Sequence, residues 1–310
     1  MKLILSRKGF DSGYGGCASP IFEDDSMVSL PIPFPGGKHL LSEVTNLNGN
    51  CADSDLLAQL TQRRKDSNKH TGATKVHLDP YLKQYRASAA PGWRPAFGQD
   101  GAAQSHLKNE GVGVGDLFLF FGWFRRVERL KDKDSKDAWR FVPRSADLQV
   151  MFGWLQIDEV LNIEGRSALG AKHAWLKDHP HWKQRKEMGE GNTIYVAKPR
   201  LVIDGKDLGS GGGTFDRFKD CLQLTEPEQR LRSVWRLPSW FHPGGASPLL
   251  SCHRDPDRWF RPDATGSTTR LRSVPIGQEF VLDLENVERQ EAMAWLTSLF
   301  TPVGACGIDP

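Results

Sequence analysis

Two long apolar stretches, both rich in aromatic residues, dominate the hydrophobic pattern of the chain. The first follows a glycine-rich turn at Gly115-Asp116 and continues within residues 111–128 as Leu-Phe-Leu-Phe-Phe-Gly-Trp-Phe. The second occupies 150–161, after a charged segment at 131–138. Aromatic and β-branched residues favour strands. The pattern therefore predicts two strands joined by a basic hairpin, as part of a small barrel.

The weaker patterns predict the elements around this pair. Lys2–Ser6 is expected to form the first buried strand, and Glu279–Leu284 is expected to form a late strand. Met27–Pro33 is expected to form a strand at the edge of a sheet, because its prolines have no N–H to donate to a neighbouring strand. Helical spacing of apolar residues predicts helices over 53–64, 102–109 and 288–300. In the last of these, Ala292, Trp295, Leu296 and Leu299 are expected on one face.

These elements predict an α+β fold. We expect one mixed domain over residues 1–310, with a central barrel-like sheet, flanking helices and long loops. Residues 111–204 are expected to form the barrel-like part of that domain.

The overall charge does not by itself identify a ligand. The 310 residues carry a formal charge of +3, which is too small to indicate nucleic-acid binding. Any basic surface that binds nucleic acid must therefore be local. Arg and Lys cluster at 124–131 and 183–186. Solvated loop charges are the alternative interpretation of both clusters.

The cysteines and the N-terminus bear on the compartment. Five scattered cysteines with no paired spacing predict reduced thiols in a cytoplasmic protein. The apolar run at the N-terminus is too short for a signal peptide or a membrane span. We therefore expect no membrane partner.

A glycine-rich loop follows the first predicted strand and is the first candidate site. Backbone N–H groups of such a loop can approach an anion, and Arg7 and Lys8 add positive charge. Asp11 is a candidate catalytic base and Ser12 a candidate nucleotide ligand. The spacing matches neither the P-loop nor the dinucleotide fingerprint. In the alternative interpretation Asp11 caps its own turn.

A second candidate lies at the end of a predicted strand over 74–78. His77 and Asp79 are two residues apart, so their side chains would share a face of a strand. That arrangement permits a hydrogen-bonded acid/base pair, and both are candidate catalytic residues. An Asp-Pro turn beside a partly buried histidine is the alternative.

Amide and imidazole groups in 97–107 form a third candidate. Gln99, Gln104 and His106 can read a base edge or bind a phosphate. On a helix, Gln104 and His106 diverge by roughly 200°, so they cannot both face one ligand unless the helix begins later. Helix capping is the competing interpretation.

The fourth candidate is the aromatic and basic end of the first long strand. Trp123 can stack on a base and Arg125 can pair with a phosphate. Because side chains alternate along a strand, Phe121 and Trp123 share one face and Phe124 takes the other. One of those faces is expected to be core.

No metal site is predicted. His173, His179 and His181 are dense in a segment expected to be exposed, but Pro180 interrupts helical spacing and no acidic or cysteine partner stands nearby in sequence. The pattern leaves any cofactor unknown.

These motifs together resemble the nucleotide modification associated domain family, third type. The resemblance covers most of the chain and is carried by Ser6-Arg7-Lys8-Gly9-Phe10-Asp11-Ser12, Ser19-Pro20-Ile21, Leu30-Pro31-Ile32-Pro33, His77-Leu78-Asp79-Pro80, residues 99–107 and residues 115–125. It implies an association with systems that modify nucleotides or DNA bases in bacteria and phages, without defining an activity. Tyr81 departs from the pattern, which has an acidic residue there.

The Gly115-Asp116-Leu117 strand also resembles PUA-like barrels, which bind modified bases. That second resemblance implies a PUA-like form for the central sheet.

Three functional hypotheses follow. The first is a nucleotide- or DNA-base-modifying enzyme, and the second is a non-catalytic reader of modified bases. The third is a structural subunit whose aromatic loops contact other proteins. Expected partners are a nucleotide or nucleic acid and other components of a DNA-modification system. The first two hypotheses require the glycine-rich loop and the Trp123 strand to line a common cleft.

Overall fold

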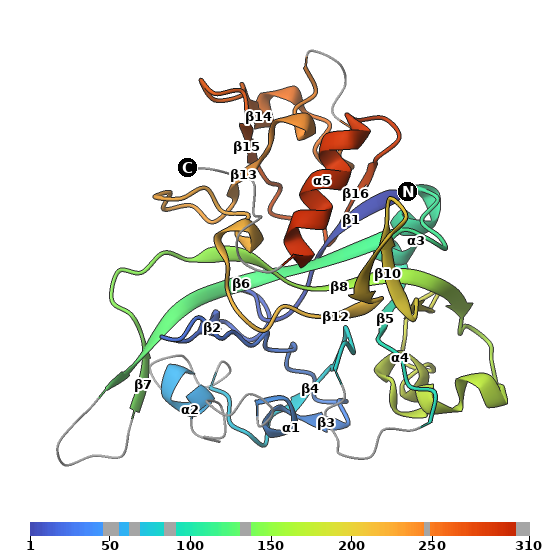
Figure 1. Cartoon of the computed structure of the whole chain (residues 1–310). Helices are drawn as coiled ribbons and strands as arrows, with labels where there is room; N and C mark the ends of the chain where they lie inside the picture. Colours follow the sequence, from blue (N-terminus) through green and yellow to red (C-terminus); the bar gives the residue numbers. More distant parts are fainter. Residues whose placement is uncertain (46–55, 62–68, 84–90, 131–137, 245–248, 302–310) are drawn as a thin grey trace.

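The computed structural model describes residues 1–45, 56–61, 69–83, 91–130, 138–244 and 249–301. Within them, a nine-stranded mixed sheet crosses the molecule (Figure 1). Its main path is β16 (Glu279–Asp283), β1 (Lys2–Arg7), β6 (Leu117–Leu130), β8 (Leu148–Asn162), β9 (Thr193–Ala197) and β5 (Ala96–Gln99). Three further strands join it, β2 (Ser19–Ile21) and β7 (Ala138–Phe141) on β6 and β12 (Gly212–Thr214) on β8.

The predicted aromatic strand pair is confirmed. β6 and β8 pair antiparallel, with Phe118 opposite Leu155 and a register shift after Phe120. β1 pairs parallel to β6 on one side and antiparallel to β16 on the other. The charged segment 131–137 lies outside the described residues.

The predicted barrel is not found. In the described part of the chain the two end strands, β16 and β5, do not pair, so the sheet is open and no PUA-like closure is present. The apolar run in β6 has a different cause. Leu117–Phe121 is fully buried because other elements cover both faces of the strand. The fold is therefore α+β with a large mixed sheet and few helices.

Smaller elements surround this sheet. Two other sheets have two antiparallel strands each. β3 (His39–Leu40) pairs with β4 (Lys75–Val76), and β10 (Arg200–Ile203) forms a hairpin with β11 (Lys206–Ser210). A third has the order β13 (Val234–Pro238), β15 (Thr268–Arg272), β14 (Trp259–Phe260). The helices are α1 (Leu41–Thr45), α2 (Leu56–Thr61), α3 (Gly101–Asn109), α4 (Pro180–Lys183) and α5 (Arg289–Phe300), with 3-10 turns η3 (Ala171–Asp178), η4 (Asp220–Leu222), η5 (Ser239–Phe241) and η6 (Pro256–Arg258).

The predicted helices are confirmed, whereas the predicted edge strand is not. α3 and α5 match the predicted ranges closely, and Ala292, Trp295, Leu296 and Leu299 of α5 are all buried. α2 covers the described part of the helix predicted over 53–64. The predicted strand over Met27–Pro33 is wrong, because its ends make only isolated bridges.

The thiol prediction needs a correction. Cys221 is disulfide-bonded, whereas Cys252 is a free thiol. In the described residues, no helix is long and apolar enough to cross a membrane.

Aromatic rings fill the core on both faces of β6. Phe97, Phe118, Phe120 and Tyr195 form one group with ring centroids 5.1–6.0 Å apart. Phe121, Trp235 and Phe280 form another, with centroids 5.1–6.2 Å apart. Each ring removes a large apolar area from water, so these two groups stabilise the central strand strongly.

We expect Phe118→Ala to lower the free energy of unfolding by about 3–5 kcal/mol, because it leaves a cavity among these rings. Urea unfolding measures the change. Val160→Ala is the control, since Val160 on β8 is 42% exposed. Equal losses in the two variants would contradict a core centred on β6.

Candidate functional site

A cleft of about 620 Å³ lies where the glycine-rich loop meets β6. Its lining residues are Arg7, Lys8, 10–14, Trp123, Asp147, Gln149, 230–233, Trp235 and 273–275. The prediction that the loop and the Trp123 strand share a cleft is therefore confirmed. Trp123 points toward the cleft and Phe124 is fully buried, which matches the predicted alternation along the strand.

The cleft is basic and partly aromatic. Four cationic side chains (Arg7, Lys8, Arg230, Arg232) line it against two carboxylates (Asp11, Asp147). Two of its rings are accessible, since Tyr14 is 62% exposed and Trp123 is half-buried. The lining thus combines positive charge with flat apolar surfaces.

Arg232 joins the two sides of the cleft. Its guanidinium carbon lies 4.1 Å from the centroid of the Trp123 ring, and Nη2 donates to Ser12 Oγ at 2.7 Å. The indole Nε1 of Trp123 donates to Asp147 Oδ1 at 2.9 Å. Burial lowers the pKa of Arg232, although neighbouring carboxylates act in the opposite direction. Arg232 was missed in the sequence because it lies in a loop with no recognisable motif.

Three of the predicted loop residues already have protein partners. Arg7 donates to the carbonyls of Pro275 and Val274, at 2.8 and 2.9 Å. Lys8 Nζ forms an ion pair of 2.7 Å with Glu279 Oε1. Asp11 Oδ1 accepts from the backbone N–H groups of residues 13 and 14, at 2.7 and 2.6 Å. The turn-capping interpretation of Asp11 therefore agrees with its contacts.

Other predicted ligands do not line the cleft. Gln104 accepts from the Tyr195 hydroxyl and His106 Nε2 contacts Ser251 Oγ, so the two diverge on α3 as helical geometry requires. Arg125 donates to the hydroxyl of residue 145 and the carbonyl of residue 142, near its own hairpin. Gln99 points to Glu279, which accepts from its amide at 2.6 Å.

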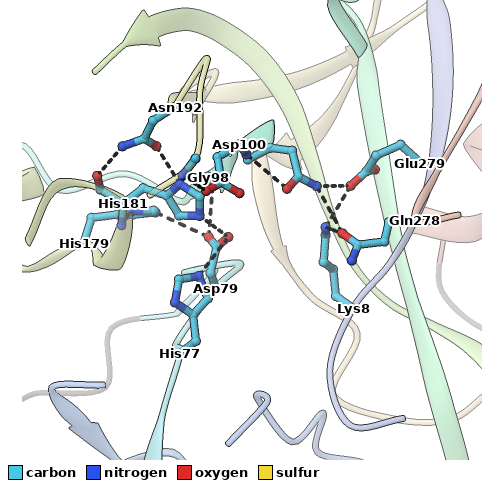
Figure 2. Close-up of polar contacts among 12 residues, drawn as sticks. Lys8, His77, Asp79, Gly98, Asp100, His179, His181, Asn192, Gln278 and Glu279 are labelled. Carbon is cyan, nitrogen blue, oxygen red and sulfur yellow. Dashed lines mark hydrogen bonds and ion pairs between the residues drawn. The ribbon is translucent and has the colours of Figure 1, made fainter. Parts of the chain in front are cut away.

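A buried cluster of histidines surrounds Asp79 (Figure 2). Asp79 Oδ2 lies 3.9 Å from His77 Nε2 and 3.6 Å from His181 Nε2, while Oδ1 lies 3.5 Å from His179 Nε2. The Asp79 side chain is 4% exposed. The backbone N–H of Gly98 on β5 donates to Oδ1 at 2.9 Å. His77 and Asp79 thus lie close together, but β4 ends at Val76, before either residue, and the pair is too far apart for the predicted hydrogen bond. Two further imidazoles join them.

The segment that carries His179 and His181 was expected to be exposed, and that expectation is wrong. Trp175 and Trp182 pack with apolar residues of β8 and β9 and bury this part of the chain. Pro180 begins α4, a position proline favours, rather than breaking a helix. The acidic partner of these histidines is Asp79, which is about a hundred positions away in the chain and adjacent in space.

Burial sets the protonation preferences of this cluster. It raises the pKa of Asp79 to about 8 and lowers that of His77 to about 3. It also lowers the pKa values of His179 and His181. Low dielectric surroundings disfavour every charged form, which explains why the carboxyl and imidazole values move in opposite directions.

Lys8 lies between the cleft and the cluster. It lines the cleft. Burial lowers the pKa of His77 and the positive charge of Lys8 adds to this effect, whereas at Asp79 the same charge opposes the rise in pKa that burial causes. Figure 2 shows its ion pair with Glu279, which also accepts from Gln99. Because Gln99 follows Gly98 on β5, one short strand contacts both the cluster and the Lys8 ion pair.

Fold and site together define an α+β protein with a basic, aromatic cleft beside a buried histidine–aspartate cluster. The chain belongs to the nucleotide modification associated domain 3 family, whose pattern matches residues 2–283. Comparison with curated proteins and with solved structures gives no match.

We expect Gly98→Ala to lower the free energy of unfolding by about 1–3 kcal/mol, as overpacking does. A Cβ at this position would lie 2.2 Å from the ring of His181, so the ring would have to move. Thermal or urea unfolding tests this expectation.

Gly113→Ala is the matched control, because a Cβ there meets nothing within 4 Å. If Gly98→Ala were as well tolerated as this control, the close packing of β5 against α4 would be refuted.

Proposed function

We propose that this chain binds a phosphorylated nucleotide, free or within a nucleic acid, in the cleft and serves in nucleotide modification. The observation that carries the proposal is the cleft lining, in which four cations and two accessible rings surround a space of about 620 Å³. Membership of the nucleotide modification associated domain 3 family supports the same ligand class.

The charge of the lining favours an anion. Burial removes part of the water around the Arg232 guanidinium, which is unfavourable for a cation. A bound phosphate would compensate this charge. Arg230 is exposed at the same cleft. In this proposal these two residues bind phosphate, while Arg7 and Lys8 support the loop through their carbonyl and carboxylate contacts.

The rings favour a planar base. Trp123 is held in place by its bond to Asp147, so its orientation is fixed before a ligand arrives. Tyr14 stands exposed on the glycine-rich loop. Rigid rings at a cleft provide stacking surfaces that accept any base.

A modification reaction in this chain would use the cluster behind Lys8. His77 and Asp79 are the proposed catalytic residues, because buried imidazole and carboxyl groups that lie together occur at sites that move protons or hold a metal ion. The competing proposal is a reader that binds a modified base and leaves the chemistry to another protein; the rigid Trp123 favours that role.

We expect Trp123→Ala to weaken nucleotide binding roughly 5- to 150-fold, since stacking contributes about 1–3 kcal/mol per base. Arg232→Ala is expected to weaken binding and to reduce the slope of the logarithm of the affinity against the logarithm of the salt concentration by about 1. Fluorescence anisotropy with a labelled single-stranded oligonucleotide, competed by nucleoside triphosphates, measures both effects.

Arg200→Ala is the control, because Arg200 is an exposed arginine on β10 that pairs with Asp207, outside the cleft lining. The binding proposal fails if the two cleft variants bind as the wild type does, or if the control loses as much affinity.

Nucleoside analysis by mass spectrometry separates the enzyme from the reader. DNA and nucleotide pools from cells expressing the wild-type chain should contain an altered nucleoside that disappears with Asp79→Asn. Intact binding by Asp79→Asn, with no altered nucleoside in either strain, would instead support the reader.

A further inference from the structure

The cluster around Asp79 has the composition and spacing of a metal site. One ligand atom from each of His77, Asp79 and His181 can be chosen so that all three lie within 4.8 Å of one another. Two imidazole nitrogens with one carboxylate oxygen form a donor set that suits divalent first-row transition metals. We propose that His77, Asp79 and His181 bind one such ion.

The separations within the cluster favour an ion over direct hydrogen bonds. Asp79 Oδ2 lies 3.6 and 3.9 Å from the Nε2 atoms of His181 and His77, which is too long for a hydrogen bond. Ligand atoms about 2.1 Å from a tetrahedral metal lie about 3.4 Å from each other. The two Asp79 separations are therefore only about 0.2 and 0.5 Å longer than those in such a site.

The orientation of His181 is already that of a metal ligand. Asn192 Nδ2 donates to the His181 carbonyl at 2.9 Å, so the Asn192 oxygen must face the imidazole, where Oδ1 lies 2.7 Å from Nδ1. An amide oxygen only accepts, and Nδ1 must then carry the proton. The unprotonated Nε2 then faces Asp79. In metal sites, an outer acceptor of this kind binds the second ring N–H and so fixes the orientation of the histidine.

His179 has a different part in this arrangement. Its Nδ1 accepts from the backbone N–H of His181 at 3.2 Å, which puts the proton of the neutral ring on Nε2. That fully buried Nε2 has no hydrogen-bond partner among the described residues and lies 3.5 Å from Asp79 Oδ1. The Gly98 N–H donates to Oδ1, which leaves Oδ2 for the ion.

The cluster also places a buried carboxyl group among imidazoles. Asp79 is surrounded by His77, His179 and His181, and the nearby Lys8 ammonium pairs with Glu279. A buried carboxylate needs a compensating charge or a proton. A divalent ion supplies that charge, and three protein ligands leave it open positions for water or substrate.

The test uses the purified full-length chain, stripped with a chelator, and titrated with Co²⁺ and then Zn²⁺. The wild type is expected to bind one equivalent of Co²⁺ with visible ligand-field absorption, which Zn²⁺ displaces. No nucleotide is present, so the outcome is independent of the cleft. The absence of one-equivalent binding by the wild type would overturn the proposal.

Substitutions then locate the ion. Asn192→Ala is expected to weaken binding about 10- to 100-fold, and His77→Ala, Asp79→Asn and His181→Ala by more than that. His242→Ala, a histidine outside the cluster, should bind as the wild type does. Equal binding in the ligand variants and this control would place the ion elsewhere and refute the site.

X-ray absorption of the Zn²⁺-loaded wild type gives an answer even if a variant does not fold. It should show nitrogen and oxygen ligands near 2.0–2.1 Å, with the outer scattering of two imidazoles. A spectrum without imidazole would contradict the assignment.

Discussion

The parallel pairing of β1 with β6 is the constraint on which the cleft depends. It sets Arg7 beside Phe121, and the Lys8 N–H donates to the Phe121 carbonyl at 2.8 Å. Gly122 makes the approach possible, because a Cβ there would lie 2.7 Å from the Lys8 carbonyl oxygen. The chain therefore leaves β1 next to Trp123, and the glycine-rich loop and the tryptophan face one space.

The second constraint is the short strand β5. Its pairing with β9 places the Gly98 N–H against Asp79 and the next side chain, Gln99, against Glu279. Because Gly98 has no side chain, the ring of His181 can pack against it and lie beside Asp79. Through these contacts the buried cluster and the Lys8 ion pair become neighbours.

The sequence predicts elements with strong local patterns and fails where distant segments meet. The aromatic pair β6–β8 and the helices α3 and α5 follow from periodicity. The spacing of His77 and Asp79 indicates that they are close, although neither is in a strand. The open edge of the sheet was not predictable, because an apolar run in a barrel strand and in a doubly covered strand look alike. His181 and Arg232 needed tertiary contacts, although the His-x-Asp and His-Pro-His spacings were visible signals.

Photo-cross-linking with an oligonucleotide that carries bromodeoxyuridine tests the central claim, that the cleft between the glycine-rich loop and β6 receives the base. Mass spectrometry of the digested adduct should find the cross-link on peptides containing Tyr14 or Trp123. Cross-links confined to the basic segment 183–186, or spread over the surface without preference, would contradict the account.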